Sequence, residues 1–156
     1  MLVRLFRLPA AEPELQRLVG EGVRVRPCMP FEAHIMEEWV GRHFSRRWVS
    51  EARVAMAHRP GGCFIATRGG SILGFACYDA TARGFFGPMG VQESARGMGV
   101  GRALLLAALH HMRAMGYAYA VIGGVGPADF YRKTVGATDI PDSTPGIYED
   151  ILPETS

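Results

Sequence analysis

The sequence predicts a single α/β domain built around a mostly antiparallel sheet. Three apolar runs between residues 63 and 91 are joined by short glycine-containing turns, which is typical of an antiparallel meander. A glycine-rich turn and an amphipathic helix then lead to a continuous apolar run at 117–124, the pattern of a central strand covered on both faces. A chain of 156 residues has the length of one domain and can bury a substantial core.

The first elements of the chain look like an addition to that domain. Residues 2–6 alternate apolar and basic side chains, and a short helix follows Pro13 and ends at Gly20 or Gly22. We therefore expect a strand-helix extension over residues 1–22, packed on a main domain at 23–156. The first core strand is expected from Val23, before Pro27 stops it.

Two helices are expected next. The first opens with Pro30 at the first helical position and repeats apolar residues along one face at Phe31, Ile35, Trp39 and Val40. The segment 41–48 interrupts this pattern. Ser50 is then expected to cap a second helix over residues 51–58, with Glu51 in its first turn.

Strands and two helices account for the rest of the chain. The helix at 102–115 carries an apolar stripe and ends at Gly116, and Pro127 opens a last helix through Val135. Gly87, Pro88 and Gly90 indicate a strand that bends away from a neighbour. The expected strands are 63–67, 72–79, 84–91, 117–124, 137–140 and 147–152, the last two joined by a Pro145-Gly146 turn.

The composition excludes several classes of protein. A net charge of +2 is too small to indicate nucleic-acid binding, and 48% hydrophobic residues exclude a disordered chain. No apolar run is long enough to span a membrane, and residues 1–16 lack the apolar stretch of a signal peptide. We therefore predict a cytoplasmic protein without membrane or nucleic-acid partners.

Cysteine and histidine placement indicates no metal site. The three cysteines, Cys28, Cys63 and Cys77, are widely spaced and form no CxxC pair, so we expect reduced, buried thiols. His110 and His111 are adjacent on an expected helix and therefore point in different directions.

The glycine-rich turn is the most informative stretch for function. It lies between a strand that ends near Val91 and the helix that starts near Arg102, and it contains three glycines in five residues, Gly97, Gly99 and Gly101. The first turn of a helix leaves N–H groups unpaired and carries a partial positive charge, which suits phosphate. The alternative is that these glycines only make a tight turn between strand and helix.

Spacing separates three kinds of phosphate-binding turn. A Walker turn needs a lysine directly after its last glycine, and the single lysine, Lys133, is far away. A Rossmann turn needs a third glycine at position 102 or 104, where Arg102 and Leu104 stand instead.

The pattern that remains, Arg96-x-x-Gly99-x-Gly101, resembles the pyrophosphate loop of the GNAT superfamily of acetyl-CoA-dependent N-acetyltransferases. A second segment, residues 130–137 (FYRKTVGA), is similar to the superfamily's FYxKxGF motif, with one extra residue before the glycine and Ala137 in place of the aromatic. The resemblance covers about residues 23–152. The run STPGIY at 143–148 is similar to a branch of the superfamily whose acceptor has not been identified.

This resemblance implies a mixed, mostly antiparallel sheet splayed between its fourth and fifth core strands, with acetyl-CoA as cosubstrate and no metal. It implies direct transfer of an acetyl group to a primary amine of a small molecule or peptide. Superfamily members are often dimers, which leaves a homodimer open. The residues implied to bind coenzyme A are Met89, Gly90, Val91, Arg96, Gly97, Met98, Gly99, Val100, Gly101 and Arg102.

The resemblance also implies one catalytic side chain. Tyr131 aligns with the tyrosine that protonates the leaving thiolate; the alternative is a helix tyrosine that only packs its ring. The general base is not identified, because the run 117–124 carries no carboxylate. Candidates, each with a surface or structural role as the alternative, are Glu38, Glu51, Asp79, His34 and His43.

Acceptor choice in the superfamily is set by the first two helices and the last hairpin. This implies acceptor contacts from Arg42, His43, Arg46, Trp48, Ser143 and Thr144. Aromatic residues beside arginines favour an acceptor with an apolar body and an acidic group. Core packing for the tryptophans and a solvated face for the arginines are the alternatives.

Other functions are left open by the sequence. One is transfer of a different acyl group, or transfer to a different acceptor atom. Another is a catalytically silent acyl-CoA sensor or interaction module, which the missing strand carboxylate favours and Tyr131 opposes. A Rossmann nucleotide-binding domain is contradicted by the glycine spacing and by the meander before the turn.

Overall fold

The computed structural model describes residues 1–154, and its centre is one six-stranded sheet in the order β1-β6-β5-β4-β3-β2. Neighbouring strands are antiparallel except for the parallel pair β5 and β6. This confirms the predicted α/β class and the mostly antiparallel sheet. The strands are β1 (Leu2–Arg4), β2 (Arg24–Pro27), β3 (Cys63–Arg68), β4 (Ser71–Tyr78), β5 (Phe85–Val91) and β6 (Tyr119–Ile122).

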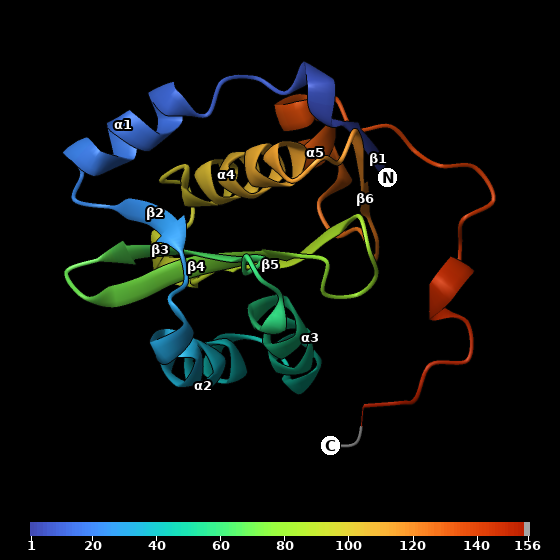
Figure 1. The fold of residues 1–156 in the computed structure, drawn as a ribbon, viewed down its shortest axis with the longest axis horizontal. Helices are drawn as coiled ribbons and strands as arrows, with labels where there is room; N and C mark the ends of the chain where they lie inside the picture. The colour runs from blue at the N-terminus through green and yellow to red at the C-terminus, as the bar shows by residue number, and fades with distance from the viewer. Residues whose placement is uncertain (155–156) are drawn as a thin grey trace.

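Helices cover both faces of the sheet (Figure 1). On one face lie α1 (Glu12–Gly20), α4 (Val100–Ala114) and α5 (Ala128–Val135), and on the other lie α2 (Ala33–His43) and α3 (Arg46–Ala57). Short 3-10 turns occur at Leu5–Arg7, Pro30–Glu32, Glu93–Ala95 and Gly146–Tyr148. Among residues 1–154, no helix is long and apolar enough to cross a membrane.

The core has one part on each side of the sheet. Under α4, Leu104, Leu105 and Leu109 are fully buried, whereas Met36 and Phe75 are fully buried under α2 and α3. Burying a side chain of this size stabilises the fold by roughly 1.5–3 kcal/mol. Because α4 supplies several such residues, it is firmly fixed to the sheet, and so is the turn that precedes it.

The predicted start of the second helix was wrong. Helix α3 begins at Arg46, and the side chain of Ser45 accepts a hydrogen bond from the Trp48 backbone N–H at 3.3 Å. Ser50 lies inside the helix, where its hydroxyl donates to the Arg46 carbonyl at 3.2 Å. Both serines can cap a helix, but only Ser45 has the extended backbone that a cap requires.

The predicted C-terminal strands were also wrong. In the stretch 137–140 only Thr138 makes a bridge, to Leu2, and residues 146–148 form a 3-10 turn instead of a strand. The edge of β6 is instead taken by β1, which pairs Leu2 with Val121. A strand from the N-terminal segment therefore occupies the sheet position beside β6.

The apolar run 117–124 forms a shorter strand than predicted, and not all of it is covered. Only the four residues of β6 are in the sheet, and Tyr119 is 48% exposed. Its ring packs edge-on against Phe6, and the Tyr117 hydroxyl donates to Asp79 at 2.6 Å. Because tyrosine combines an apolar ring with a polar tip, such a run can lie at the edge of the core.

Candidate functional site

The sheet opens between β5 and β6. These strands pair only at Phe85 with Val121 and Phe86 with Ile122, although β5 continues to Val91. This confirms the predicted splay. The register between β4 and β5 shifts near Tyr78, as the glycine and proline content of β5 predicts.

The open edge presents backbone groups. The Gln92 N–H donates to the Leu73 carbonyl of β4 at 2.9 Å. The backbone N–H and C=O groups of successive strand residues point in alternate directions within the plane of the sheet. Those of Gly90 therefore point to β4, whereas those of Met89 and Val91 point toward the opening. Arg96 Nε lies 3.4 Å from the Val91 carbonyl oxygen. An extended ligand can therefore pair with this edge as an added strand would.

The glycine loop, residues 96–102, follows the 3-10 turn Glu93–Ala95 that comes after β5. Gly97 and Gly99 have φ angles of 82° and 85°, which side-chain-bearing residues rarely adopt. Gly99 is the N-cap of α4 and no side chain caps the first turn. The N–H groups of that turn therefore point to a site suited to an anion.

Helix α1 contacts this loop, which the sequence did not predict. Arg17 Nη2 donates to the Met98 carbonyl at 2.7 Å and to Glu14 Oε1 at 2.7 Å, and Glu14 Oε2 lies 4.0 Å from Arg102 Nε. A Cβ atom on Gly99 would collide with both the Arg17 and the Glu14 side chains. The spacing of acidic and basic residues on α1 indicates pairs within that helix, so nothing in it pointed to the loop.

Tyr131 lies beside the start of the opening. Its side chain comes from α5, is 7% exposed, and packs its ring edge-on against Phe86, the last residue of β5 that pairs with β6. Burial raises the pKa of its phenol above the ordinary value. At neutral pH the hydroxyl is therefore protonated and can give up a proton.

An aromatic cluster reaches the opening from the other face of the sheet. Phe44, between α2 and α3, lies with its ring centroid 5.0 Å from that of Trp48 and 5.7 Å from that of Trp39. A Cβ atom on Gly90 would collide with the Phe44 ring. His43 stacks on Trp39 with centroids 4.6 Å apart. Glycine at position 90 thus lets this aromatic cluster contact the open strand directly.

The three candidate carboxylates have different surroundings. Glu38 is largely exposed and pairs with Arg42 at 3.3 Å. Both oxygens of Asp79 are engaged, one by the Gly84 N–H at 2.7 Å and one by the Tyr117 hydroxyl at 2.6 Å. Glu51, on α3, accepts a hydrogen bond from the Thr81 hydroxyl.

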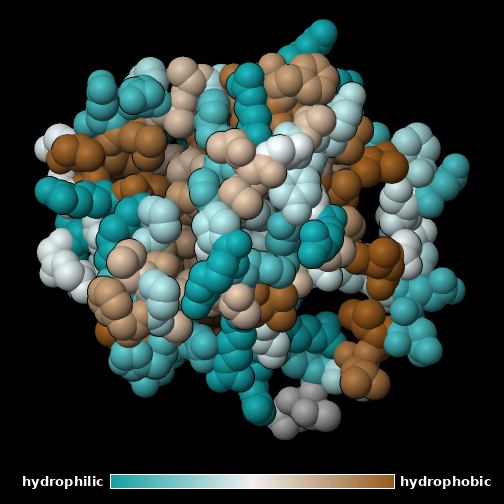
Figure 2. Space-filling view, viewed as in Figure 1, coloured by the Kyte–Doolittle hydropathy of each residue, from teal (hydrophilic) through white to brown (hydrophobic). Residues whose placement is uncertain are grey.

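The C-terminal segment 141–152 runs from the α5 side of the sheet toward α3 (Figure 1). Its Tyr148 hydroxyl lies against Gly123, directly after β6, and desolvation together with the charge of Glu51 raises the Tyr148 pKa. Leu152 is 86% exposed, and its carbonyl accepts a hydrogen bond from Arg47. Figure 2 shows an opening between this segment, with its apolar residues, and the body of the protein.

Other predicted acceptor contacts are exposed. Arg42, Arg46, Ser143 and Thr144 all lie at the surface, and the Ser143 hydroxyl donates to Pro141 within its own turn at 3.2 Å. Trp48 belongs to the aromatic cluster and His43 adjoins it. The structure therefore brings together part of the predicted acceptor set, around α2 and α3.

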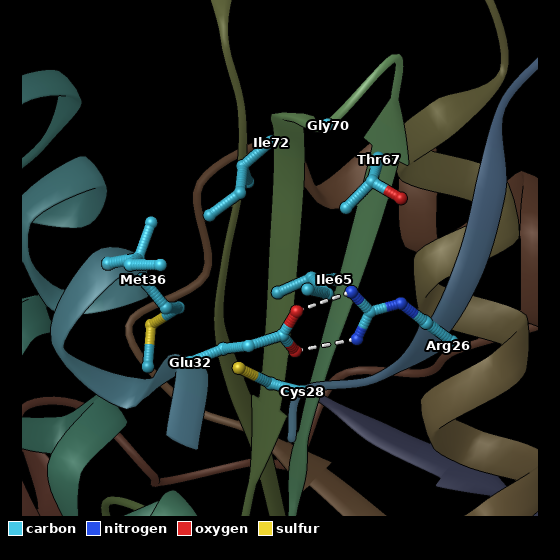
Figure 3. A pocket seen from close by; sticks show the side chains of 9 residues that line it. Arg26, Cys28, Glu32, Met36, Ile65, Thr67, Gly70 and Ile72 are labelled. Atoms are coloured by element: carbon cyan, nitrogen blue, oxygen red, sulfur yellow. Dashed lines mark hydrogen bonds and ion pairs between the residues drawn. The ribbon is translucent and has the colours of Figure 1, made fainter. Parts of the chain in front are cut away.

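Two hollows lie away from the open strand. One of about 130 Å³ lies between α2 and the β2–β4 strands, where Arg26 and Glu32 form two hydrogen bonds of 2.7 Å (Figure 3). A second, of about 190 Å³, includes Met56 and His111 in its lining. Neither is lined by the predicted coenzyme A residues.

No group of side chains in residues 1–154 is arranged to hold a metal ion. The three cysteines, which are Cys28, Cys63 and Cys77, are free and buried, as predicted.

A splayed α/β sheet whose open strand leads to a glycine-capped helix is the arrangement that the resemblance to acyltransferases implies. A model of the acetyltransferase (GNAT) family matches residues 28–137, and the chain belongs to that family. A mycothiol acetyltransferase from Thermobispora bispora is 43% identical over 133 residues, an alignment that covers 72% of this chain and 43% of that protein. The chain thus spans less than half the length of this relative.

Solved structures show the same fold. A GCN5-related N-acetyltransferase from Sphaerobacter thermophilus has a TM-score of 0.64 at 21% identity, covering 85% of this chain and 45% of that one. A GNAT family acetyltransferase from Brucella melitensis, solved in complex with acetyl-CoA, has a TM-score of 0.52 at 20% identity, covering 76% of this chain and 91% of that one.

Proposed function

We propose that this protein transfers an acetyl group from acetyl-CoA to a primary amine. The observation that carries the proposal is continuity: the open edge of β5 at Met89 and Val91 leads, through one 3-10 turn and the glycine loop, to the glycine-capped start of α4. Such a path suits a ligand with an extended amide arm that ends in a pyrophosphate. Family membership and the acetyl-CoA complex of the Brucella melitensis protein support the same ligand.

In this proposal the backbone binds the cosubstrate. N–H groups of residues 97–102 contact the pyrophosphate, with Arg96 and Arg102 adding positive charge. Residues 89–91 pair with the amide arm, and one N–H is directed at the thioester carbonyl. A backbone donor placed where negative charge develops lowers such a barrier by about 3 kcal/mol. Acetyl-CoA supplies the activated thioester.

Tyr131 acts as the general acid. Because burial raises its pKa, the phenol stays protonated at neutral pH and can protonate a thiolate at the β5–β6 opening. Its ring is held there by Phe86 and Phe130, with centroids 6.4 and 5.2 Å away.

Glu51 is the preferred general base among the candidates. Both oxygens of Asp79 are engaged, one by the Gly84 N–H of its own turn and one by the Tyr117 hydroxyl, and Glu38 lies at the surface with Arg42. Desolvation and, after it, the charge of nearby Glu51 raise the pKa of Tyr148, which lies against Gly123 directly after β6. In this proposal Glu51 is the carboxylate on the side of the opening where α3 and the C-terminal segment meet.

The acceptor is proposed to bind between the aromatic cluster and the C-terminal segment, with Arg42, His43, Arg46 and Trp48 on one side and Ser143 and Thr144 on the other. It is a small molecule or a peptide with an amine. Amines related to mycothiol belong in a first screen because the Thermobispora bispora relative is named for mycothiol. A homodimer, a cytoplasmic location and the division at residue 22 stay predictions.

Calorimetric titration with acetyl-CoA, coenzyme A and NAD in parallel tests this function. We expect both coenzyme A forms to bind and NAD not to bind. An amine screen that follows thiol release, with Tyr131→Phe as control, then tests turnover. Absence of coenzyme A binding would contradict the proposal.

A catalytically silent acyl-CoA-binding module is the second candidate. It is favoured by the absence of a carboxylate on β6, whose four residues are Tyr119–Ile122. Tight binding of acetyl-CoA without thiol release, for any amine tested and equally in Tyr131→Phe, would support it.

A further inference from the structure

Helix α1 lies outside the residues that the family model matches, yet it contacts the glycine loop. The match begins at residue 28, whereas α1 spans Glu12–Gly20. Figure 1 shows α1 beside the amino-terminal end of α4, and the two helices are in contact. The contact to the loop itself is made by the Arg17 guanidinium, which donates to the Met98 carbonyl at 2.7 Å.

This hydrogen bond fixes one peptide plane of the loop. Met98 lies between Gly97 and Gly99, both with positive φ, so its flanking backbone has the widest conformational choice in the loop. In a trans peptide the carbonyl of one residue and the N–H of the next point in opposite directions. Holding the Met98 carbonyl toward α1 therefore directs the Gly99 N–H away from α1.

The guanidinium is held from both sides. Arg17 Nη2 also donates to Glu14 Oε1 and Nη1 donates to Glu21 Oε1, each at 2.7 Å. These bonds leave the Arg17 side chain little freedom, although 43% of it is exposed. The collision that any Cβ atom on Gly99 would make with Arg17 and Glu14 shows how closely α1 and the loop fit.

We propose that Arg17 is a positioning residue for the glycine loop. By holding the Met98 carbonyl, it orients the Gly99 N–H for the pyrophosphate before the ligand arrives. This inference rests on the proposed coenzyme A function. A loop ordered in advance loses less conformational entropy on binding, which increases affinity without any contact between Arg17 and the ligand. A purely structural role would be to fasten α1 to the domain.

The experiment compares Arg17→Met, Arg17→Lys and the control Glu21→Gln, which removes the charge of a partner of Arg17 that does not touch the loop. Each protein is titrated with coenzyme A and with pantetheine, which lacks the pyrophosphate. We expect Arg17→Met to weaken coenzyme A binding about five- to tenfold, at the lower end of typical coupling between sites. Pantetheine binding should be unchanged in every variant, and Arg17→Lys should recover part of the lost affinity because it can still donate to Met98.

A second readout is the backbone order parameter of the ligand-free protein, measured by NMR relaxation. The order parameter at Gly99 should be lower in Arg17→Met than in Glu21→Gln, which tests loop ordering even if Arg17→Met lowers the melting temperature. Unchanged coenzyme A affinity in Arg17→Met, or an equal loss for both ligands, would overturn this inference alone. If the unaltered protein bound neither ligand, the proposed function would fail, and the inference with it.

Discussion

The proposed cofactor side of the site and the proposed acceptor side are built in different ways. The proposed cofactor side is the open strand β5, the loop 96–102 and helix α4, where the binding groups would belong mainly to the backbone. The proposed acceptor side is formed by α2, α3 and the C-terminal segment, where the binding groups would be side chains from separate stretches of chain. A backbone site needs glycines at fixed spacing, so a short motif reveals it, whereas a side-chain site takes shape only when distant segments meet.

The two sides also differ in how firmly they are held. Helix α4 is fixed by fully buried leucines such as Leu104 and Leu109, which keep the loop in place. On the acceptor side Trp39 and Trp48 are only partly buried, and Leu152 is 86% exposed. One cofactor site can therefore be combined with acceptor sites of different shape.

The largest effect is expected from Gly101→Val. Gly101 has an ordinary φ and the nearest neighbour of an added Cβ would be Val91 at 3.5 Å, so the fold should tolerate a side chain there. A branched side chain in the first turn of α4 should still keep the pyrophosphate from its N–H groups. Calorimetry should show coenzyme A binding weakened about 100-fold or more, a loss typical of removing several charge-assisted hydrogen bonds.

The matched control is Gly20→Ala, where no atom lies within 4 Å of the added Cβ. It should leave coenzyme A affinity unchanged and the melting temperature equal or slightly higher, because alanine favours a helix more than glycine does. If Gly101→Val bound coenzyme A normally while folded, the backbone account of the cofactor side would be wrong.

Tyr131→Phe should separate chemistry from binding. The ring contacts with Phe86 and Phe130 survive, but the proton donor is lost, so kcat should fall about 100-fold. The dissociation constant of coenzyme A should change less than about twofold, as expected for a group that acts in the transition state. Because burial raises its pKa, the loss of activity of the unaltered enzyme at alkaline pH should begin above the ordinary titration range of a free tyrosine. Equal kcat values in steady-state assays would remove Tyr131 from the mechanism.

Trp48→Ala should affect the acceptor side alone. Removal of a ring that lies 5.0 Å from Phe44 opens the aromatic cluster beside Gly90. KM for the amine should rise about tenfold, which corresponds to about 1.4 kcal/mol of lost binding, while coenzyme A affinity stays constant. Val54→Ala, an exposed position on the same helix, is the control. A parallel loss of coenzyme A affinity would show that the two sides are not independent.

The smallest effect is expected at Glu32, remote from both sides of the site. Hydrogen bonds from Arg26 and from the Met29 N–H lower the pKa of its carboxyl to about 2. The ion pair therefore stabilises the fold above the ordinary glutamate pKa of about 4.3 and loses this effect as the pH falls through about 2.

Because the two side chains are 37% and 23% exposed, solvent limits the pair to about 1 kcal/mol. Denaturant unfolding should show Glu32→Gln less stable by about that amount at pH 7 and indistinguishable from the unaltered protein below about pH 2. If Glu32→Gln lowered the free energy of unfolding equally at both pH values, packing and not the charge of Glu32 would stabilise this part of the fold.

The sequence predicted the elements whose signals are local. The meander 63–91, the loop with Gly97 and Gly99, and the α4 helix follow from turn glycines and apolar spacing, and the structure confirms all three. The choice between Ser45 and Ser50 as a cap depended on backbone conformation, which composition does not reveal.

The features that the sequence did not predict depend on tertiary contacts between distant segments of the chain. A strand pattern in the C-terminal segment was equally compatible with an irregular path, and β1 took the edge beside β6. The contact between Arg17 and Met98 joins residues 81 positions apart. No periodicity within α1 distinguishes such a contact from a solvated pair.

In the proposed function, coenzyme A lies along the open edge of β5 and on the loop before α4. The most direct test is a two-dimensional amide NMR titration with coenzyme A, which the 17.0 kDa chain allows. We predict the largest shifts at Met89, Val91 and residues 97–102. Shifts confined to the hollow of Arg26 and Glu32, or to the one lined by Met56 and His111, would contradict the account.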